Sequence, residues 1–341
     1  MNRYLRAASP YRRFARRRAE TGLTLVELMV ALAVGSFLLI GAITVFVQSR
    51  ETFRVVDSVS RLQENARFVL DALEPDVRMA SYFGLTTRPE KVLGRAGPDE
   101  DESDSFVVSG DCGTNWTIHL DAPLEGSNNR YVWECGTYGG AGAAPNADTL
   151  VVRRAAEEPE APAAGRLQIQ SARFLDSTLF VGANLPAGYT AENSQTHRLI
   201  VNGYYVSETS TLSTPGNPVP SLRVKTLVDG PAIRDEEILP GVEDMQVQFG
   251  IDTDPPGAPN RGSVDRYVNP EDPLLDPAVN PDVRVLAVRI WLRLRSERPE
   301  PGFTDTARYE YADQDIEPFN DGYRRIVVSK TIYIRNARPA A

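Results

Sequence analysis

The clearest feature of the chain is an uninterrupted apolar stretch near its N-terminus. Residues 23–47 read LTLVELMVALAVGSFLLIGAITVFV and contain one charged side chain, Glu27. At ~1.5 Å per residue a helix of this length is about 37 Å long, enough to cross the ~30 Å hydrocarbon core of a bilayer. We therefore predict a transmembrane helix over residues 23–47.

Apolar residues continue beyond this stretch, but only at every third or fourth position. This spacing predicts an amphipathic helix over residues 48–84 that packs its apolar stripe on a sheet. Pro75 lacks a backbone N–H, so we expect it to kink or restart the helix. The charged faces contain favourable pairs one turn apart and are expected to be solvated rather than partner-binding. The stripe is Val55, Val59, Leu62, Ala66, Val69, Leu73, Val77 and Ala80, and the pairs are Arg67–Asp71 and Glu74–Arg78.

The remainder of the chain, residues 85–341, has the pattern of a β-rich domain. In short runs, apolar and polar residues alternate or β-branched residues are frequent, and Pro/Gly-rich loops separate these runs. No second long helix or internal repeat is evident. We predict an α+β fold in which one long helix packs on an antiparallel β-sheet with long loops. The predicted strands are residues 105–109, 149–153, 199–206, 222–227, 245–251, 283–294 and 326–334.

Charge is distributed unevenly around the apolar stretch. The chain is 42% hydrophobic and 24% charged, as in a folded globular protein, and its net charge is −9. Residues 1–22 hold seven arginines and one acid, which leaves 30 bases against 45 acids and a net charge of about −15 for the rest. A body with this negative charge repels nucleic acid, so we do not expect nucleic acid as a partner. The positive-inside rule places residues 1–22 in the cytoplasm and exports the body.

Glu27 distinguishes between the possible functions of the apolar stretch. A secretory signal peptide fits poorly, because the stretch is too long and no A-x-A-like site follows it. A plain single-pass anchor has no use for Glu27, since a carboxylate within the span costs about 2.5 kcal/mol or more. Glu27 therefore indicates a span with a function beyond anchoring.

The residues around Glu27 resemble a known processing signal. Thr21-Gly22-Leu23-Thr24-Leu25-Val26-Glu27 resembles the signal of type IV prepilins and type II secretion pseudopilins. The resemblance implies that a prepilin peptidase in the membrane removes residues 1–22 by cutting after Gly22, and then N-methylates Leu23, where most members have phenylalanine. It also implies that Glu27 neutralises the new amine of a neighbouring subunit, which would set the axial register of the filament. A buried ion pair of this kind gives specificity more surely than stability.

Later segments narrow the resemblance to the PilW-like minor pilins. These segments are residues 61–68 with 81–84, residues 240–252, and residues 321–325 with 331–336. The resemblance implies a minor pilin that helps to initiate or cap a type IV pilus. Its partners would be other minor pilins, the major pilin, the prepilin peptidase and the inner-membrane assembly platform. It would span the inner membrane once, with its body in the periplasm, before entering the filament. Residues 85–235 resemble nothing that narrows their function.

Two other functions remain open at this stage. The large minor pseudopilin of a type II secretion system has the same anchor and general fold, and genomic neighbours would separate it from a minor pilin. A membrane-tethered periplasmic binding domain that never enters a filament is the other alternative. Replacing Glu27 by alanine separates this tether from a filament subunit, since a mere tether keeps its function whereas a filament subunit loses assembly.

Cys112 and Cys135 are the only cysteines. In an oxidising compartment an even pair indicates a disulfide. A redox-active pair is disfavoured because the spacing is not C-x-x-C. A zinc site is disfavoured because His119 is the only histidine near them.

The sequence offers little support for other chemistry. Asp252, Asp254 and Asp265 faintly resemble a calcium loop, but Pro and Gly stand where such loops carry another acid, so we expect an acidic solvated turn and no metal. With His119 and His197 as the only histidines, and with no phosphate-binding glycine loop, we expect neither catalysis nor a cofactor.

Overall fold

The structure is a computed structural model that describes residues 22–96 and 106–337. Its chain divides into two compact units, residues 1–56 and 57–341, which are described separately below. The arginine cluster that precedes the apolar stretch lies outside the described residues.

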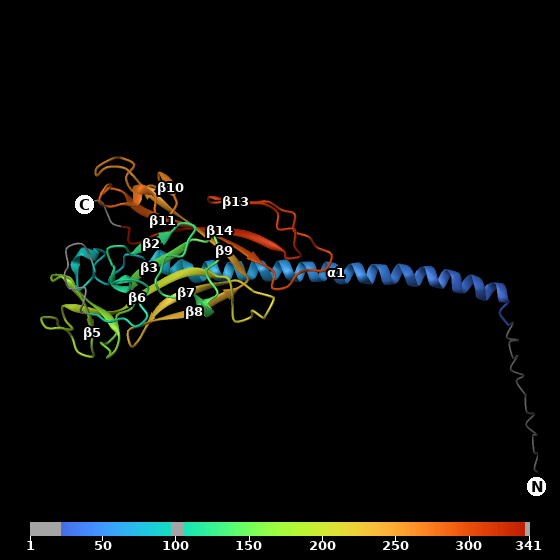
Figure 1. Cartoon of the computed structure of the whole chain (residues 1–341), viewed down its shortest axis with the longest axis horizontal. Helices are drawn as coiled ribbons and strands as arrows, with labels where there is room; N and C mark the ends of the chain where they lie inside the picture. The colour runs from blue at the N-terminus through green and yellow to red at the C-terminus, as the bar shows by residue number, and fades with distance from the viewer. Residues whose placement is uncertain (1–21, 97–105, 338–341) are drawn as a thin grey trace, which may run out of the picture. The chain divides into compact units, whose positions relative to one another are not determined.

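One long helix, α1, spans Leu25–Arg78 (Figure 1). It is the helix, among the described residues, that is long and apolar enough to cross a membrane. Of the two outcomes predicted at Pro75, a kink or a restart, the restart does not occur, because α1 continues through Pro75 and ends at Arg78. The predicted helical range to residue 84 is therefore too long. Ser81 adopts a left-handed backbone conformation that a helix cannot contain, and the Arg78 carbonyl accepts a hydrogen bond from the Arg335 amide (2.8 Å).

The first sheet has eight strands around the long strand β6. β6 pairs with β4, β3 and β7, all antiparallel, and β1 pairs with β5 in parallel. The path runs β1-β5-β4-β6-β3-β2, and β7 joins β6 to β8. The strands are β1 (Val92–Leu93), β2 (Leu124–Ser127), β3 (Thr149–Ala155), β4 (Leu167–Ala172), β5 (Ser177–Val181), β6 (Ser194–Ser207), β7 (Ser221–Val228) and β8 (Ala232–Pro240).

The second sheet is antiparallel throughout, in the order β10-β9-β11-β14. Its strands are β9 (Val242–Asp252), β10 (Arg266–Val268), β11 (Arg284–Arg295) and β14 (Arg325–Tyr333); β12 (Tyr309–Tyr311) and β13 (Gln314–Ile316) form a separate hairpin. Short 3-10 turns occur at Pro89–Lys91, Trp116–Ile118, Tyr138–Gly140 and Pro273–Leu275. The α+β prediction is confirmed.

Six of the seven predicted strands are present, and the seventh is wrong. In the described part of residues 105–109 there is only an isolated bridge from Ser109 to Ala232. β4, β5 and β8 were not predicted, nor were the short strands β1, β2, β10, β12 and β13. β8 carries four charged residues in succession, from Arg234 to Glu237, and is an edge strand whose charges reach solvent or a neighbouring strand.

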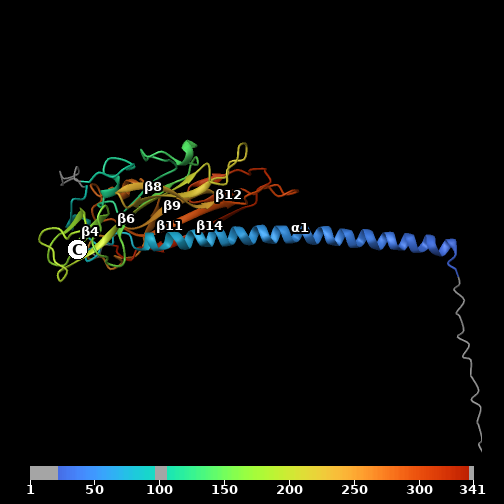
Figure 2. The same ribbon diagram turned by 90° about the horizontal axis from the view of Figure 1, so that it is seen from below.

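Two hydrophobic clusters cover the two faces of the first sheet. On β3, Leu150 and Val152 face the cluster that contains the buried stripe of α1 and the second sheet. Val151 and Ala155 face the other cluster, which the loops before β3 cover. Figure 2 shows the end of α1 beside β9, β11 and β14, as the shared cluster requires. From Leu62 onward the predicted apolar stripe is confirmed as core.

A buried carboxylate fixes the end of α1 to the first sheet. Asp76 is 7% exposed, and its Oδ1 accepts hydrogen bonds from Nε (2.9 Å) and Nη2 (2.5 Å) of Arg154 on β3. Its Oδ2 accepts from the Asn202 side-chain amide and from the Tyr204 hydroxyl (2.5 Å), both on β6. Burial, followed by the charge of Asp76, raises the pKa of Tyr204 well above its ordinary value, so the phenol stays a donor. The carboxylate thus sets where along the sheet the helix packs.

We predict that Asp76→Ala destabilises the body strongly. The change leaves the nearly buried Arg154 guanidinium without its acid, a loss of about 3–5 kcal/mol in the free energy of unfolding. Chemical denaturation of a form that begins near residue 50 measures it. Asp57→Ala is the matched control, because its pair with Arg61 is exposed and surface pairs contribute about 1 kcal/mol or less. Equal losses in the two variants would contradict the assigned contact.

A second buried carboxylate, Asp148, connects the two sheets. It precedes β3, and its side chain accepts hydrogen bonds from the amides of Asn129 (2.7 Å) and of Val247 on β9 (2.8 Å). Its own amide donates to the carbonyl of Met245, also on β9 (2.8 Å). Burial raises the pKa of Asp148 to about 7, although the two amides oppose this shift.

The raised pKa of Asp148 predicts a pH-dependent stability. Between its unfolded pKa of about 3.9 and its folded pKa of about 7, the folded state binds the proton more tightly. Stability therefore falls as pH rises through this window, by up to about 4 kcal/mol from this group, and is constant above it. Chemical denaturation between pH 4 and 8 gives the free energy of unfolding at each pH. Its decrease with rising pH should have a shallower slope in Asp148→Asn. The exposed control Glu158→Gln should keep the wild-type slope; an unchanged slope in Asp148→Asn would refute the assignment.

Candidate functional site

The segment predicted to be cleaved is exposed and lies before the helix. Gly22, Leu23 and Thr24 precede α1 without regular structure, and Leu23 is 79% exposed. No atom lies within 4 Å of the position that a Cβ on Gly22 would occupy. The peptide bond between Gly22 and Leu23 is thus accessible in this unit.

Glu27 closes a reciprocal cap at the amino end of α1. Its Oε2 accepts hydrogen bonds from the amide (2.9 Å) and hydroxyl (2.9 Å) of Thr24, and its own amide donates to the Thr24 hydroxyl (3.2 Å). This is a capping box, which satisfies amides that the first helical turn leaves free. The carboxylate is therefore aimed at the end of the helix where cleavage would create an amine on Leu23. The T-x-x-E spacing was a signal for this cap that the sequence analysis did not use.

The apolar stretch that follows is exposed along its length in the described part of its unit. Every residue from 23 to 47 is exposed except Gly35, which is partly exposed. The hydroxyls of Ser36 and Thr44 donate to carbonyls one turn earlier (both 2.8 Å), so they need no water. Such a surface requires lipid or other apolar helices around it.

The predicted disulfide between Cys112 and Cys135 is confirmed. It lies in the loop region over the second cluster, beside Trp116 and Trp133. The Glu134 amide donates to the Cys112 carbonyl (3.0 Å), which also joins the two sides of this loop. The crosslink therefore holds the cover of the first sheet in place.

The structure brings Asp252, Asp254 and Asp265 together. One carboxylate oxygen of each lies within 4.8 Å of the others. Asp252 accepts from the amides of Asp254 (3.0 Å) and Gly262 (2.7 Å), and Asp265 accepts from the amide and hydroxyl of Thr253 (2.7 and 2.8 Å). These contacts close the loop after β9. The expectation of a solvated turn is wrong for Asp252, which is buried while it accepts two backbone amides.

Two segments that resemble the PilW-like pilins meet at Arg325. This guanidinium, 1% exposed, contacts Glu243 (2.7 Å), Asp305 (3.0 Å) and Asp321 (2.7 Å). Burial lowers its pKa, but the hydrogen bonds that it donates to Asp321 and Glu243 outweigh burial and raise the pKa. Glu243 belongs to the segment 240–252 and Asp321 to the segment 321–325, so Arg325 holds the long loop before β14 onto β9.

The charged face of α1 is less solvated than expected. Lys330 on β14 contacts Asp71 (2.9 Å) and Glu74 (2.5 Å), so these two acids bind the second sheet. The predicted pairs one turn apart, Arg67–Asp71 and Glu74–Arg78, are also formed.

Two family models match parts of the chain. Residues 203–336 match the family model of the type IV pilus-assembly protein W, and residues 17–43 match that of the prokaryotic N-terminal methylation motif. Among solved structures, the chain is similar to a type IV-like pilin from Thermus thermophilus, at 18% identity and a TM-score of 0.23, over 52% of this chain and 87% of that one. No curated protein matches the chain. The resemblance to the PilW-like minor pilins is confirmed.

We predict that removing the disulfide destabilises the body without changing its fold. The bond closes a loop of 23 residues, and its loss costs about 3 kcal/mol in the chain-entropy model. The double variant Cys112→Ser/Cys135→Ser should therefore unfold at lower denaturant, with circular dichroism unchanged before the transition. Wild type under strong reductant should reproduce the variant. If the double variant unfolded at the same denaturant concentration as oxidised wild type, the prediction would be wrong.

Proposed function

We propose, on the premise that the chain is a PilW-like protein of the type IV pilin kind, that it is a minor pilin that helps to initiate or cap a type IV pilus. The observation that carries the proposal is the uncovered apolar part of α1, whose only charge is the carboxylate at its amino end. A filament core of packed helices would cover that surface. The size of the body and its long loops support a minor rather than a major subunit, because they are difficult to repeat along a filament.

In this proposal the prepilin peptidase cleaves after Gly22 and N-methylates Leu23. The exposed segment Gly22–Thr24 offers the bond without unwinding any helix. The body is periplasmic, α1 crosses the inner membrane once, and residues 1–22 are cytoplasmic until they are removed.

Glu27 has two successive functions in the proposal. Before assembly it caps its own helix through Thr24. On assembly it neutralises the amine of an adjacent subunit, another minor pilin or the major pilin, while the inner-membrane assembly platform holds both. An unpaired carboxylate is costly in an apolar core, so subunits out of register are rejected.

We predict that charge, rather than capping, is what assembly requires at Glu27. Glu27→Gln keeps the size and an acceptor for the cap but removes the charge, and it should lower the number of surface pili at least about tenfold. The control Thr24→Ala weakens only the cap, by about 1 kcal/mol, and should leave the number of pili near wild type. Counts by electron microscopy, with membrane levels checked by immunoblot, measure both. Normal piliation in Glu27→Gln would favour a simple tether.

A further inference from the structure

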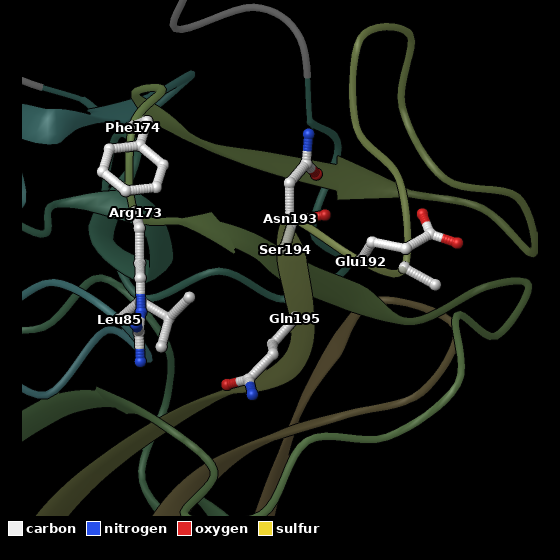
Figure 3. Close-up of a pocket in the computed structure, with 8 residues that line it drawn as sticks. Leu85, Arg173, Phe174, Glu192, Asn193, Ser194 and Gln195 are labelled. Carbon is white, nitrogen blue, oxygen red and sulfur yellow. The ribbon is translucent and has the colours of Figure 1, made fainter.

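A groove of about 320 Å³ lies at one end of the first sheet (Figure 3). It begins where β4 and β6 stop pairing, at the pair Ala172 and Ser194. Beyond that pair the chain diverges. Arg173 and Phe174 form one wall, Glu192 and Asn193 lie on the other, and Leu85 lies beside Arg173.

Hydrogen bonds hold both walls of the groove in place. The Tyr189 hydroxyl donates to the carbonyl of Asp176 (2.6 Å), which ties the loop before β6 to the β4–β5 turn. The Thr190 amide donates to Asn193 Oδ1 (2.9 Å), and the Ser194 hydroxyl donates to the Thr190 carbonyl (2.6 Å). A surface fixed in this way loses little conformational entropy when it binds.

The two opposed charges of the groove have no ionic partner among the described residues. Arg173 makes no ion pair or hydrogen bond there, and the acid in the same turn, Asp176, pairs with Lys91 (3.2 Å). Glu192 has no cation, and a hydrogen bond from Thr190 lowers the pKa of its carboxylate, which stays ionised. Arg173 and Glu192 lie on opposite sides of the groove (Figure 3).

Phe174 is 92% exposed, the largest exposed fraction among the large hydrophobic residues of the described chain. An aromatic ring that is almost fully in water adjoins a cavity of roughly ligand size. The groove region therefore presents a projecting ring, a recess, one free cation and one free anion.

We propose that this groove binds the same groove of a second copy of the chain. In a two-fold arrangement the Phe174 ring of each copy enters the recess of the other, and Arg173 of each pairs with Glu192 of the other. A two-fold interface needs such a self-complementary surface. A phosphate-bearing partner fits less well, since Glu192 would repel what Arg173 attracts. Copies confined to one membrane meet at high effective concentration, so even a small interface is populated.

Charge exchange tests the arrangement directly. The full chain in detergent is compared by sedimentation equilibrium as wild type, Arg173→Glu, Glu192→Arg and the double variant. Each single exchange places like charges together at both symmetric contacts, and should raise the dimer dissociation constant at least about tenfold. The double exchange restores opposite charges and should return the constant to near wild type. All four proteins contain α1, so any association through the apolar helix contributes equally to each and does not affect the comparison.

Phe174→Ala tests the ring independently of charge. It should also raise the dissociation constant at least about tenfold, whereas Val279→Ala, which removes an exposed apolar residue outside the groove, should not. Equal thermal melting of the variants shows that folding is unchanged.

Three results would overturn the proposal: a wild type that is monomeric at every concentration, single exchanges without effect, or a double exchange that fails to restore the dimer. A monomeric wild type whose recovery with another filament subunit falls in Arg173→Glu would assign the groove to a different chain. The Glu27 assay does not depend on any of these results.

Discussion

The buried carboxylate of Asp76 is the contact on which the arrangement of the body depends. An apolar stripe alone allows a helix to slide along a sheet, because hydrophobic contacts have little directionality. Asp76 removes this freedom, since its two oxygens meet donors from Arg154 on β3 and from Asn202 and Tyr204 on β6. The cost of burying the charge is offset only when all of these donors are present, so one position of the helix is selected.

Three further polar contacts hold the second sheet: one joins it to α1, one joins it to the segment before β3, and one fixes the loop before β14. Lys330 on β14 contacts α1, Asp148 bonds to β9, and Arg325 holds the loop before β14 to β9. The two family matches cover α1 only as far as residue 43, together with residues 203–336, and neither includes strands β1 to β5 of the eight-stranded sheet. In the body, the matched segment contains Tyr204, Arg325 and Lys330, whereas Arg154, Asn202 and the groove lie outside both matches.

The sequence predicted those elements whose signals are local. The apolar stretch, the stripe from Leu62 to Val77, most long strands and the disulfide all follow from periodicity or composition. Asp76 was missed because its partners are 78 to 128 residues away, and an acid next to the stripe reads as part of the solvated face. β8 was missed because its charges suit only an edge strand, a position that pairing alone reveals. The groove forms where two connections diverge, which no periodicity encodes. Thr24 is different, since its capping spacing with Glu27 was readable and was overlooked.

The central claim is that this chain is processed as a filament subunit, and the mass of its mature form tests that claim most directly. Intact-mass analysis of the protein purified from membranes, with the Cys112–Cys135 disulfide closed, should give a chain that begins at Leu23 and is heavier by one methyl group. A functional form that retains Met1, or that begins at any other residue, would contradict the account.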